Sequence, residues 1–227
     1  MMISRFQTAT LFLLFTLTSS AVLAQYNDIY KQGAWTERDK WQQVPKILEA
    51  LDLQENSFIA DIGSHQGYMT VKMAENIGEL GKVYAVDVDQ WKLDKLKRIL
   101  KERGLEDRVE VIKGEYDNPK LPENQLDAVL IMDAYHEMDD YKEILRHIKN
   151  SLKSDGRLVL IEPVSDNREK WSRSRQEEKH EIAIRYACND LKKAGFTITK
   201  EIYPFIDRED IKGDKLWMIV AKPVKEI

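Results

Sequence analysis

The stretch Phe58-Ile59-Ala60-Asp61-Ile62-Gly63-Ser64-His65-Gln66-Gly67-Tyr68 decides the fold of this 227-residue chain. Its apolar first half predicts a short buried strand, its two glycines predict a tight turn, and the residues from Tyr68 onward predict a helix. The spacing of Gly63 and Gly67 differs from the glycine spacing of a dinucleotide-binding fingerprint. A turn of this kind lets backbone N–H groups approach a ligand closely.

A carboxylate ends the next predicted strand, Lys82–Asp87. The carboxyl ends of parallel strands meet at one edge of a sheet, where an acid can accept hydrogen bonds from both hydroxyls of a ribose. The glycine turn and Asp87 together therefore predict a nucleoside pocket at that edge.

Strand and helix patterns alternate along the chain until they change near its C-terminus. Further strands are predicted at 108–112, 126–133 and 157–162, each followed by a loop or a helical pattern. The last two predicted strands, 196–203 and 216–222, have no helix between them, which predicts an antiparallel hairpin at the sheet edge. The pattern predicts an α/β fold: a doubly wound, mostly parallel sheet with helices on both faces.

The segments Asp61–Tyr68 and Gly81–Asp87 resemble class I S-adenosylmethionine (SAM)-dependent methyltransferases, and the resemblance runs from about Arg38 to the C-terminus. It implies a Rossmann-like, seven-stranded sheet with an antiparallel C-terminal hairpin. It also implies transfer of a methyl group from SAM to an unidentified small-molecule acceptor. The chain departs from the family at His65, where the family usually carries a third glycine. Arg38 and Gln42, in a helix expected to cover the cofactor pocket, could reach the ligand or lie on a solvated face.

The resemblance also implies a set of cofactor-binding residues at neighbouring strand ends: Asp61, Gly63, Ser64, His65, Gly67, Asp87, Val88, Glu115 and Asp133. Within that set, Asp61 holds the amino-acid end of SAM and Asp87 the ribose. Val88 lies beside the adenine, Glu115 meets its amino group, and Asp133 opens toward the transferred methyl group. Three alternatives stay open for the His65 ring: it contacts the ligand, it fills the pocket, or it points to solvent.

Tyr135 and His136 are the candidate catalytic residues, because they follow the strand at 126–133 where the family places residues that face the substrate. His136 has the pKa range of a general base, and Tyr135 could line the pocket or hold the acceptor. The alternative is that both side chains simply pack and cap the next helix.

A metal site is not expected. His136, Glu137, Glu162 and His180 could converge on an ion, but the chain has no His-Glu-x-x-His motif and no cysteine cluster. Positions 173, 176 and 180 have the spacing of one helical face, which could bind an anionic acceptor or cover the pocket, or could be solvated.

The N-terminus has the pattern of a secretory signal peptide over residues 1–24, with a positive start, a short apolar run and small residues before Gln25. We expect cleavage there, a mature N-terminal segment at 25–37, and a methyltransferase domain at 38–227. The mature protein would be exported to the periplasm or the extracellular space. An uncleaved segment would instead leave the chain cytoplasmic or anchored to the membrane.

Other functions receive less support from the sequence. A net charge of −4 gives no basic surface for nucleic acid. A nicotinamide-dependent oxidoreductase conflicts with the glycine spacing and the terminal hairpin. An exported, non-catalytic protein that keeps the methyltransferase fold and binds a nucleoside-like ligand or a partner stays open, because SAM is made in the cytosol. Nothing in the sequence indicates the oligomeric state.

Overall fold

The computed structural model describes residues 30–208 and 215–224, and these fall into two compact units that divide after Lys40. In the first unit a 3₁₀ turn, η1 (Gln32–Ala34), leads into helix α2 (Trp35–Trp41), and the Arg38 guanidinium lies 5.3 Å from the centre of the Tyr30 ring. The predicted signal peptide and the start of the segment at 25–37 lie outside the described residues.

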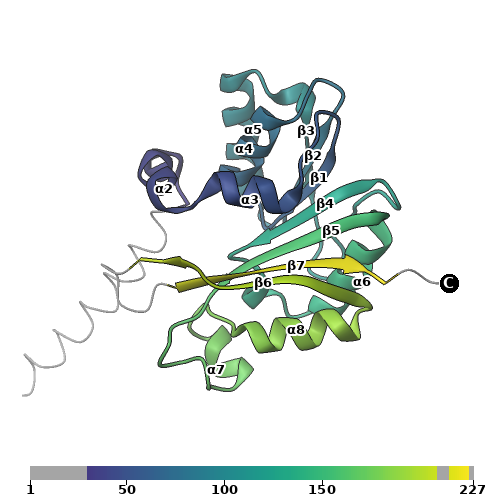
Figure 1. Cartoon of the computed structure of the whole chain (residues 1–227). Coiled ribbons are helices and arrows are strands. Elements are labelled where there is room, and N and C mark those ends of the chain that lie inside the picture. Colours follow the sequence, from purple (N-terminus) through teal and green to yellow (C-terminus); the bar gives the residue numbers. More distant parts are fainter. Residues whose placement is uncertain (1–29, 209–214, 225–227) are drawn as a thin grey trace, which may run out of the picture. The chain divides into compact units, whose positions relative to one another are not determined.

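The second unit contains a seven-stranded sheet in the order β3-β2-β1-β4-β5-β7-β6 (Figure 1). The strands are β1 (Phe58–Ile62), β2 (Lys82–Asp87), β3 (Val109–Lys113), β4 (Leu126–Met132), β5 (Leu152–Pro163), β6 (Phe196–Asp207) and β7 (Lys215–Pro223). The first five run parallel to one another, and β7 runs antiparallel to both β5 and β6. The predicted fold class, including the antiparallel ending, is confirmed.

The register of the central strands brings their carboxyl ends together. Ile62, the last residue of β1, pairs with Val86 of β2 on one side and with Ile131 of β4 on the other. Because these strands are parallel, the residues that follow them lie at one edge of the sheet, which is where α/β folds bind ligands.

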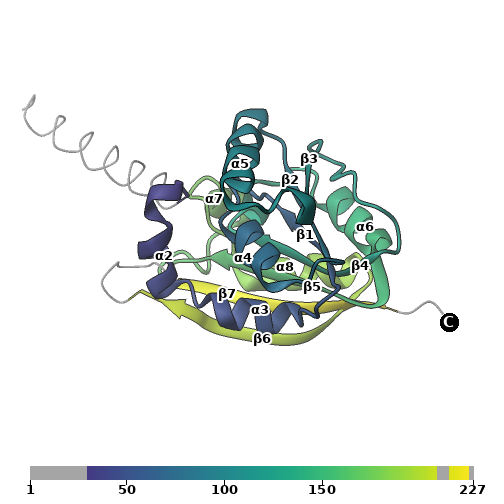
Figure 2. The same ribbon diagram turned by 90° about the horizontal axis from the view of Figure 1, so that it is seen from above.

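Helices cover both faces of this sheet: α3 (Val44–Leu51), α4 (Tyr68–Asn76), α5 (Gln90–Arg103), α6 (Tyr141–Ser151), α7 (Arg173–Glu177) and α8 (Ile184–Lys193). Figure 1 shows α3 and α8 on opposite faces, and Figure 2 shows β6 running beside β7. Two further 3₁₀ turns are η2 (Glu106–Arg108) and η3 (Tyr135–Glu137). Within the described residues, no helix combines the length and apolar character needed to cross a bilayer.

The core is built on strands with two buried faces. Ala128, Val129, Leu130 and Ile131 of β4 are all fully buried, as expected for a central parallel strand. Trp217 of β7 is fully buried too, and its indole N–H donates to the Ile182 carbonyl at 2.7 Å. The β7 strand is therefore part of the hydrophobic core.

Two aromatic residues mark local features of the helices. The helical pattern that starts at Trp41 is interrupted at Gln43, whose φ of 52° is left-handed, so α3 begins only at Val44, with Pro45 in its first turn. Trp91, in the first turn of α5, has an exposed side chain, and the centre of its ring lies 3.8 Å from the Lys95 ammonium.

Candidate functional site

The glycine turn folds back against the end of β2. The N–H groups of Gly63 and Ser64 both donate to the Val86 carbonyl, at 2.9 and 3.0 Å. Gly63 and Gly67 have φ angles of 79° and 90°, which L side chains rarely adopt. A Cβ on Gly63 would also stand 2.5 Å from the Ala134 Cβ. The turn thus needs glycine at 63 for its own packing as well as for any ligand.

His65 takes the backbone conformation that a glycine would supply, with a φ of 51°. Its backbone N–H donates to Asp87 Oδ2 at 2.9 Å, while the Asp89 N–H donates to Asp87 Oδ1, also at 2.9 Å. The Asp87 carboxylate is therefore held beside the turn, and each of its oxygens keeps a second lone pair. The role of the His65 ring stays a prediction.

Asp61 and Ser64 complete the buried part of the turn. The Thr70 hydroxyl donates a hydrogen bond to Asp61 Oδ2 at 2.6 Å, and both side chains are buried. In the described part of the chain, the Ser64 hydroxyl is buried without a hydrogen-bond partner. Buried polar groups normally have partners, so this hydroxyl is available to a ligand. The roles of Asp61 and Ser64 in binding SAM stay predictions.

The remaining predicted cofactor residues lie at the same edge but are more open. Val88 directly follows β2 and is exposed. Glu115 follows β3, and its carboxylate forms an exposed ion pair with Lys120 at 2.7 Å. Asp133 follows β4 with a left-handed φ of 56°. The structure thus gathers the predicted set at one sheet edge, although Glu115 already has a lysine partner.

A buried ion pair lies at the ends of β4 and β5. Nδ1 of His136 is 2.6 Å from Oε2 of Glu162, and Glu162 is fully buried. The other oxygen of Glu162 accepts the N–H groups of Ala134 and Tyr135, at 2.7 and 2.6 Å. Burial on its own lowers the pKa of His136, but the Glu162 carboxylate and its hydrogen bond outweigh burial and raise that pKa to about 9.

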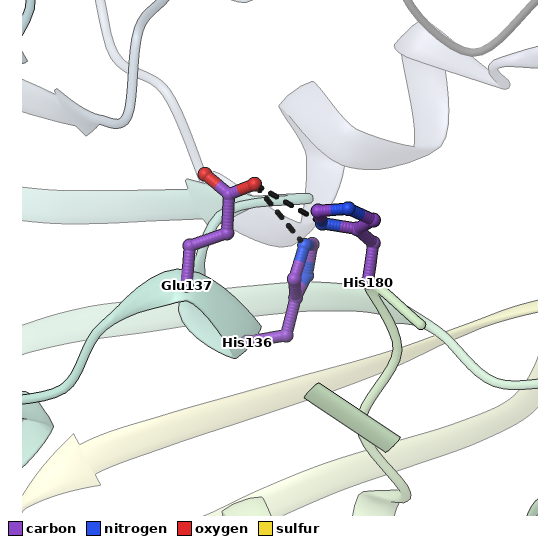
Figure 3. A group of neighbouring side chains, drawn as sticks. All are labelled: His136, Glu137 and His180. Atoms are coloured by element: carbon purple, nitrogen blue, oxygen red, sulfur yellow. Dashed lines mark ion pairs between the residues drawn. The ribbon is translucent and has the colours of Figure 1, made fainter. Parts of the chain in front are cut away.

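Two further side chains meet the outer nitrogen of His136 (Figure 3). Oε1 of Glu137 lies 3.8 Å from His136 Nε2 and 3.3 Å from His180 Nδ1. The two imidazole rings meet edge to face, with their centres 5.7 Å apart. Glu162 lies on the other side of His136, so three of the four side chains considered as metal ligands converge on one point.

Tyr135 belongs to a separate, buried network. Its hydroxyl donates to Asp190 Oδ2 at 3.1 Å, and the Arg173 guanidinium contacts the same carboxylate. Burial, followed by the charge of Asp190, raises the pKa of Tyr135. The catalytic roles of Tyr135 and His136 stay predictions. Nε2 of His136 faces Glu137, whereas the Tyr135 hydroxyl is bound to Asp190.

The expectation of one helical face at positions 173, 176 and 180 is wrong. Helix α7 ends at Glu177, and His180 adopts a left-handed φ of 54° beyond it. Gln176 is fully buried and donates to the carbonyls of Arg168 and Glu169. Sequence reasoning also missed Asp190. Its position could have been a signal, because Asp190 lies on the same helical face as the apolar residues Ala187 and Leu191.

Known proteins resemble this chain in sequence. Residues 59–156 match a family model described as a methyltransferase domain. The ubiquinone/menaquinone biosynthesis C-methyltransferase UbiE of Shewanella sp. (strain ANA-3) is 24% identical over 143 residues, which cover 63% of this chain and 54% of that protein. The corresponding enzyme of Proteus mirabilis is 25% identical over 122 residues, 52% of this chain and 49% of the relative. The chain thus spans about half the length of these relatives.

Solved structures share the fold over most of the chain. A SAM-dependent methyltransferase from Aquifex aeolicus superposes with a TM-score of 0.71 at 21% identity, over 88% of this chain and 98% of that chain. The [4+2]-cyclase SpnF superposes with a TM-score of 0.68 at 21% identity, over 81% of each chain. The resemblance to class I methyltransferases drawn from the sequence is confirmed.

Proposed function

We propose that this chain, whose residues 59–156 match a methyltransferase-domain model, moves a methyl group from SAM to a small-molecule acceptor. The observation that carries the proposal is the Asp87 carboxylate, held next to the glycine turn by the His65 and Asp89 N–H groups. SAM supplies an electrophilic methyl group on a sulfonium, so the protein needs chiefly to bind it and to align an acceptor.

The chain's own residues divide this work. Asp87 presents both oxygens to the ribose hydroxyls, and Asp61, oriented by Thr70, faces the amino-acid end. His136 is the residue we place against the acceptor. Its Nδ1 is committed to Glu162, so Nε2 is the atom left to face the acceptor's side of the site. Tyr135, bound to Asp190, serves as a positioning residue that anchors the η3 turn carrying His136.

Calorimetric titration with S-adenosylhomocysteine, the product of SAM, tests the cofactor site. The full chain should bind one equivalent, and Asp87→Asn should weaken binding by about tenfold to hundredfold, because hydrogen bonds to a charged acceptor are lost. Asp94→Asn is the matched control, since Asp94 is an exposed acid of α5 whose carboxylate bonds only Gln90 among the contacts described. Absence of binding to the unaltered chain would refute the cofactor assignment.

Methyl transfer itself requires an acceptor. Incubation of the protein and SAM with a small-molecule extract of its native host should form S-adenosylhomocysteine faster than either component alone. Binding of SAM without any product from such extracts would favour a non-catalytic, nucleoside-binding protein instead.

A further inference from the structure

We propose that His136, Glu137 and His180 bind a divalent transition-metal ion that holds the methyl acceptor, an inference that rests on the proposed function only for the ion's role. The three side chains each direct one ligand atom to a common point, and these atoms lie within 4.8 Å of one another. Imidazole nitrogens with one carboxylate oxygen are a ligand set for zinc, iron, cobalt or nickel.

The separations agree with ligation of a single ion. Two ligands placed about 2.1 Å from a tetrahedral ion stand about 3.4 Å apart. The Glu137 oxygen is 3.3 Å from His180 Nδ1 and 3.8 Å from His136 Nε2. The two ligand nitrogens lie within 4.8 Å of each other, so closure on one ion requires movement of the Glu137 and His180 side chains, whose exposure permits it. Figure 3 shows both rings directed at the same carboxylate.

Glu162 gives His136 the support that metal-ligating histidines have. Its oxygen holds Nδ1 at 2.6 Å, which directs Nε2 outward and fixes the ring orientation. Backbone N–H groups of Ala134 and Tyr135 hold Glu162 in turn. Asp133, His136 and Glu162 form a second possible group, but both Glu162 oxygens there are already committed. The outer group is therefore the better site.

Exposure makes this an open site. The side chain of His136 is 3% exposed, whereas those of Glu137 and His180 are 61% and 55% exposed. Three protein ligands with an exposed side leave further coordination positions for a substrate, as in catalytic rather than structural metal sites.

The cluster lies near the glycine turn, so an acceptor bound to the ion would lie near SAM. Ala134, two residues before His136, contacts Gly63 of the turn that we assign to SAM. An acceptor with an ionisable oxygen or sulfur would lose its proton to solvent and bind the ion as an anion. A lone pair of that atom would form the bond to the methyl carbon while the carbon–sulfur bond breaks and the sulfur keeps the electron pair.

Metal titration of the full chain tests the site directly. After treatment with a chelator and its removal, the protein should bind one equivalent of Zn²⁺ by calorimetry. One equivalent of Co²⁺ should give visible absorption bands of a coordinated ion. His180→Ala and Glu137→Gln should each weaken binding at least about tenfold, and Glu162→Gln should weaken it about tenfold to hundredfold. His147→Ala is the matched control, because His147 lies on α6 outside the cluster.

No stoichiometric binding, or binding that His180→Ala and Glu137→Gln leave unchanged, would overturn the proposal. These two positions are exposed, so their variants should fold, which circular dichroism would check. Titration of each variant with S-adenosylhomocysteine separates the two proposals. Retained nucleoside binding with lost metal binding supports the metal site, and metal binding without nucleoside binding would refute the proposed function alone.

Discussion

Gly63 lies so close to Ala134 that a Cβ on the glycine would stand 2.5 Å from the alanine Cβ. This contact joins the turn assigned to the cofactor to the segment that carries His136 and Glu137. The two halves of the candidate site are therefore packed directly on one another, and a change at the contact should disturb both.

Gly63→Ala should lower the free energy of unfolding by about 2–5 kcal/mol, from a left-handed backbone and an overpacked contact together. Gly104→Ala is a matched control: its φ of 65° is also left-handed, but a Cβ there would meet nothing within 4 Å. That control should cost about 1–2 kcal/mol. Urea denaturation measures both, and equal losses would show that the Ala134 contact does not matter.

His65→Gly should leave binding of S-adenosylhomocysteine unchanged, because the hydrogen bond to Asp87 comes from the backbone N–H and survives the substitution. Calorimetry provides the test. Weaker binding would show that the imidazole contacts the ligand, and stronger binding would show that it obstructs the pocket. Either result would rule out the third alternative, a ring that points to solvent.

Arg173→Leu should lower the free energy of unfolding by about 3 kcal/mol, because it leaves Asp190 buried with Tyr135 as its remaining partner. Replacing both Arg173 and Asp190 with leucine should recover part of that loss of stability. Arg146→Ala is the control, since its ion pair with Glu143 is about half exposed and should contribute less than about 1 kcal/mol. A loss at Arg173 no larger than at Arg146 would refute the buried network.

Cys188, the single cysteine of the chain, should react slowly with iodoacetamide. Burial, followed by the charge of Glu201, raises the pKa of its thiol to about 11. The reactive thiolate is then about one molecule in a thousand at pH 8, against about a quarter for an ordinary thiol. The alkylation rate should rise through pH 11, and Glu201→Gln should shift that rise to lower pH. A midpoint near pH 8.5 would contradict the assigned pKa.

Export is tested by the intact mass of the protein made in its native host. We expect a chain that begins at Gln25, because small residues precede that position as in a signal-peptidase site. A mass that still includes residues 1–24 would mean an uncleaved segment. Fractionation of the same cells would then show whether the protein is cytoplasmic or bound to the membrane.

The sheet was predictable because its signals are local. Each parallel strand is a short apolar run that ends in a turn residue or an acid, as at Asp87 and Asp133. The missing helix between 203 and 216 likewise identified the antiparallel pair. These features depend on neighbouring residues in the sequence, so they could be read without coordinates.

The side-chain clusters were harder to predict because they depend on contacts between distant segments. His136 and His180 meet only through the path of the chain after β5, including the left-handed residue at 180 itself. The partnership of Tyr135 with Asp190 joins a loop to a helix 55 positions away. The helical spacing of positions 173, 176 and 180 was misleading, because α7 ends at Glu177 and does not reach His180.

The position of β7 has a consequence for biosynthesis. This strand lies between β5 and β6, yet it is the last of the described strands to leave the ribosome. Until it arrives, β5 has an unpaired edge and Ile182 lacks the indole that caps its carbonyl. A nascent chain of this topology cannot complete the sheet until Lys215–Pro223 has been synthesised, and a chain without its completed sheet is the form that a secretion channel can thread.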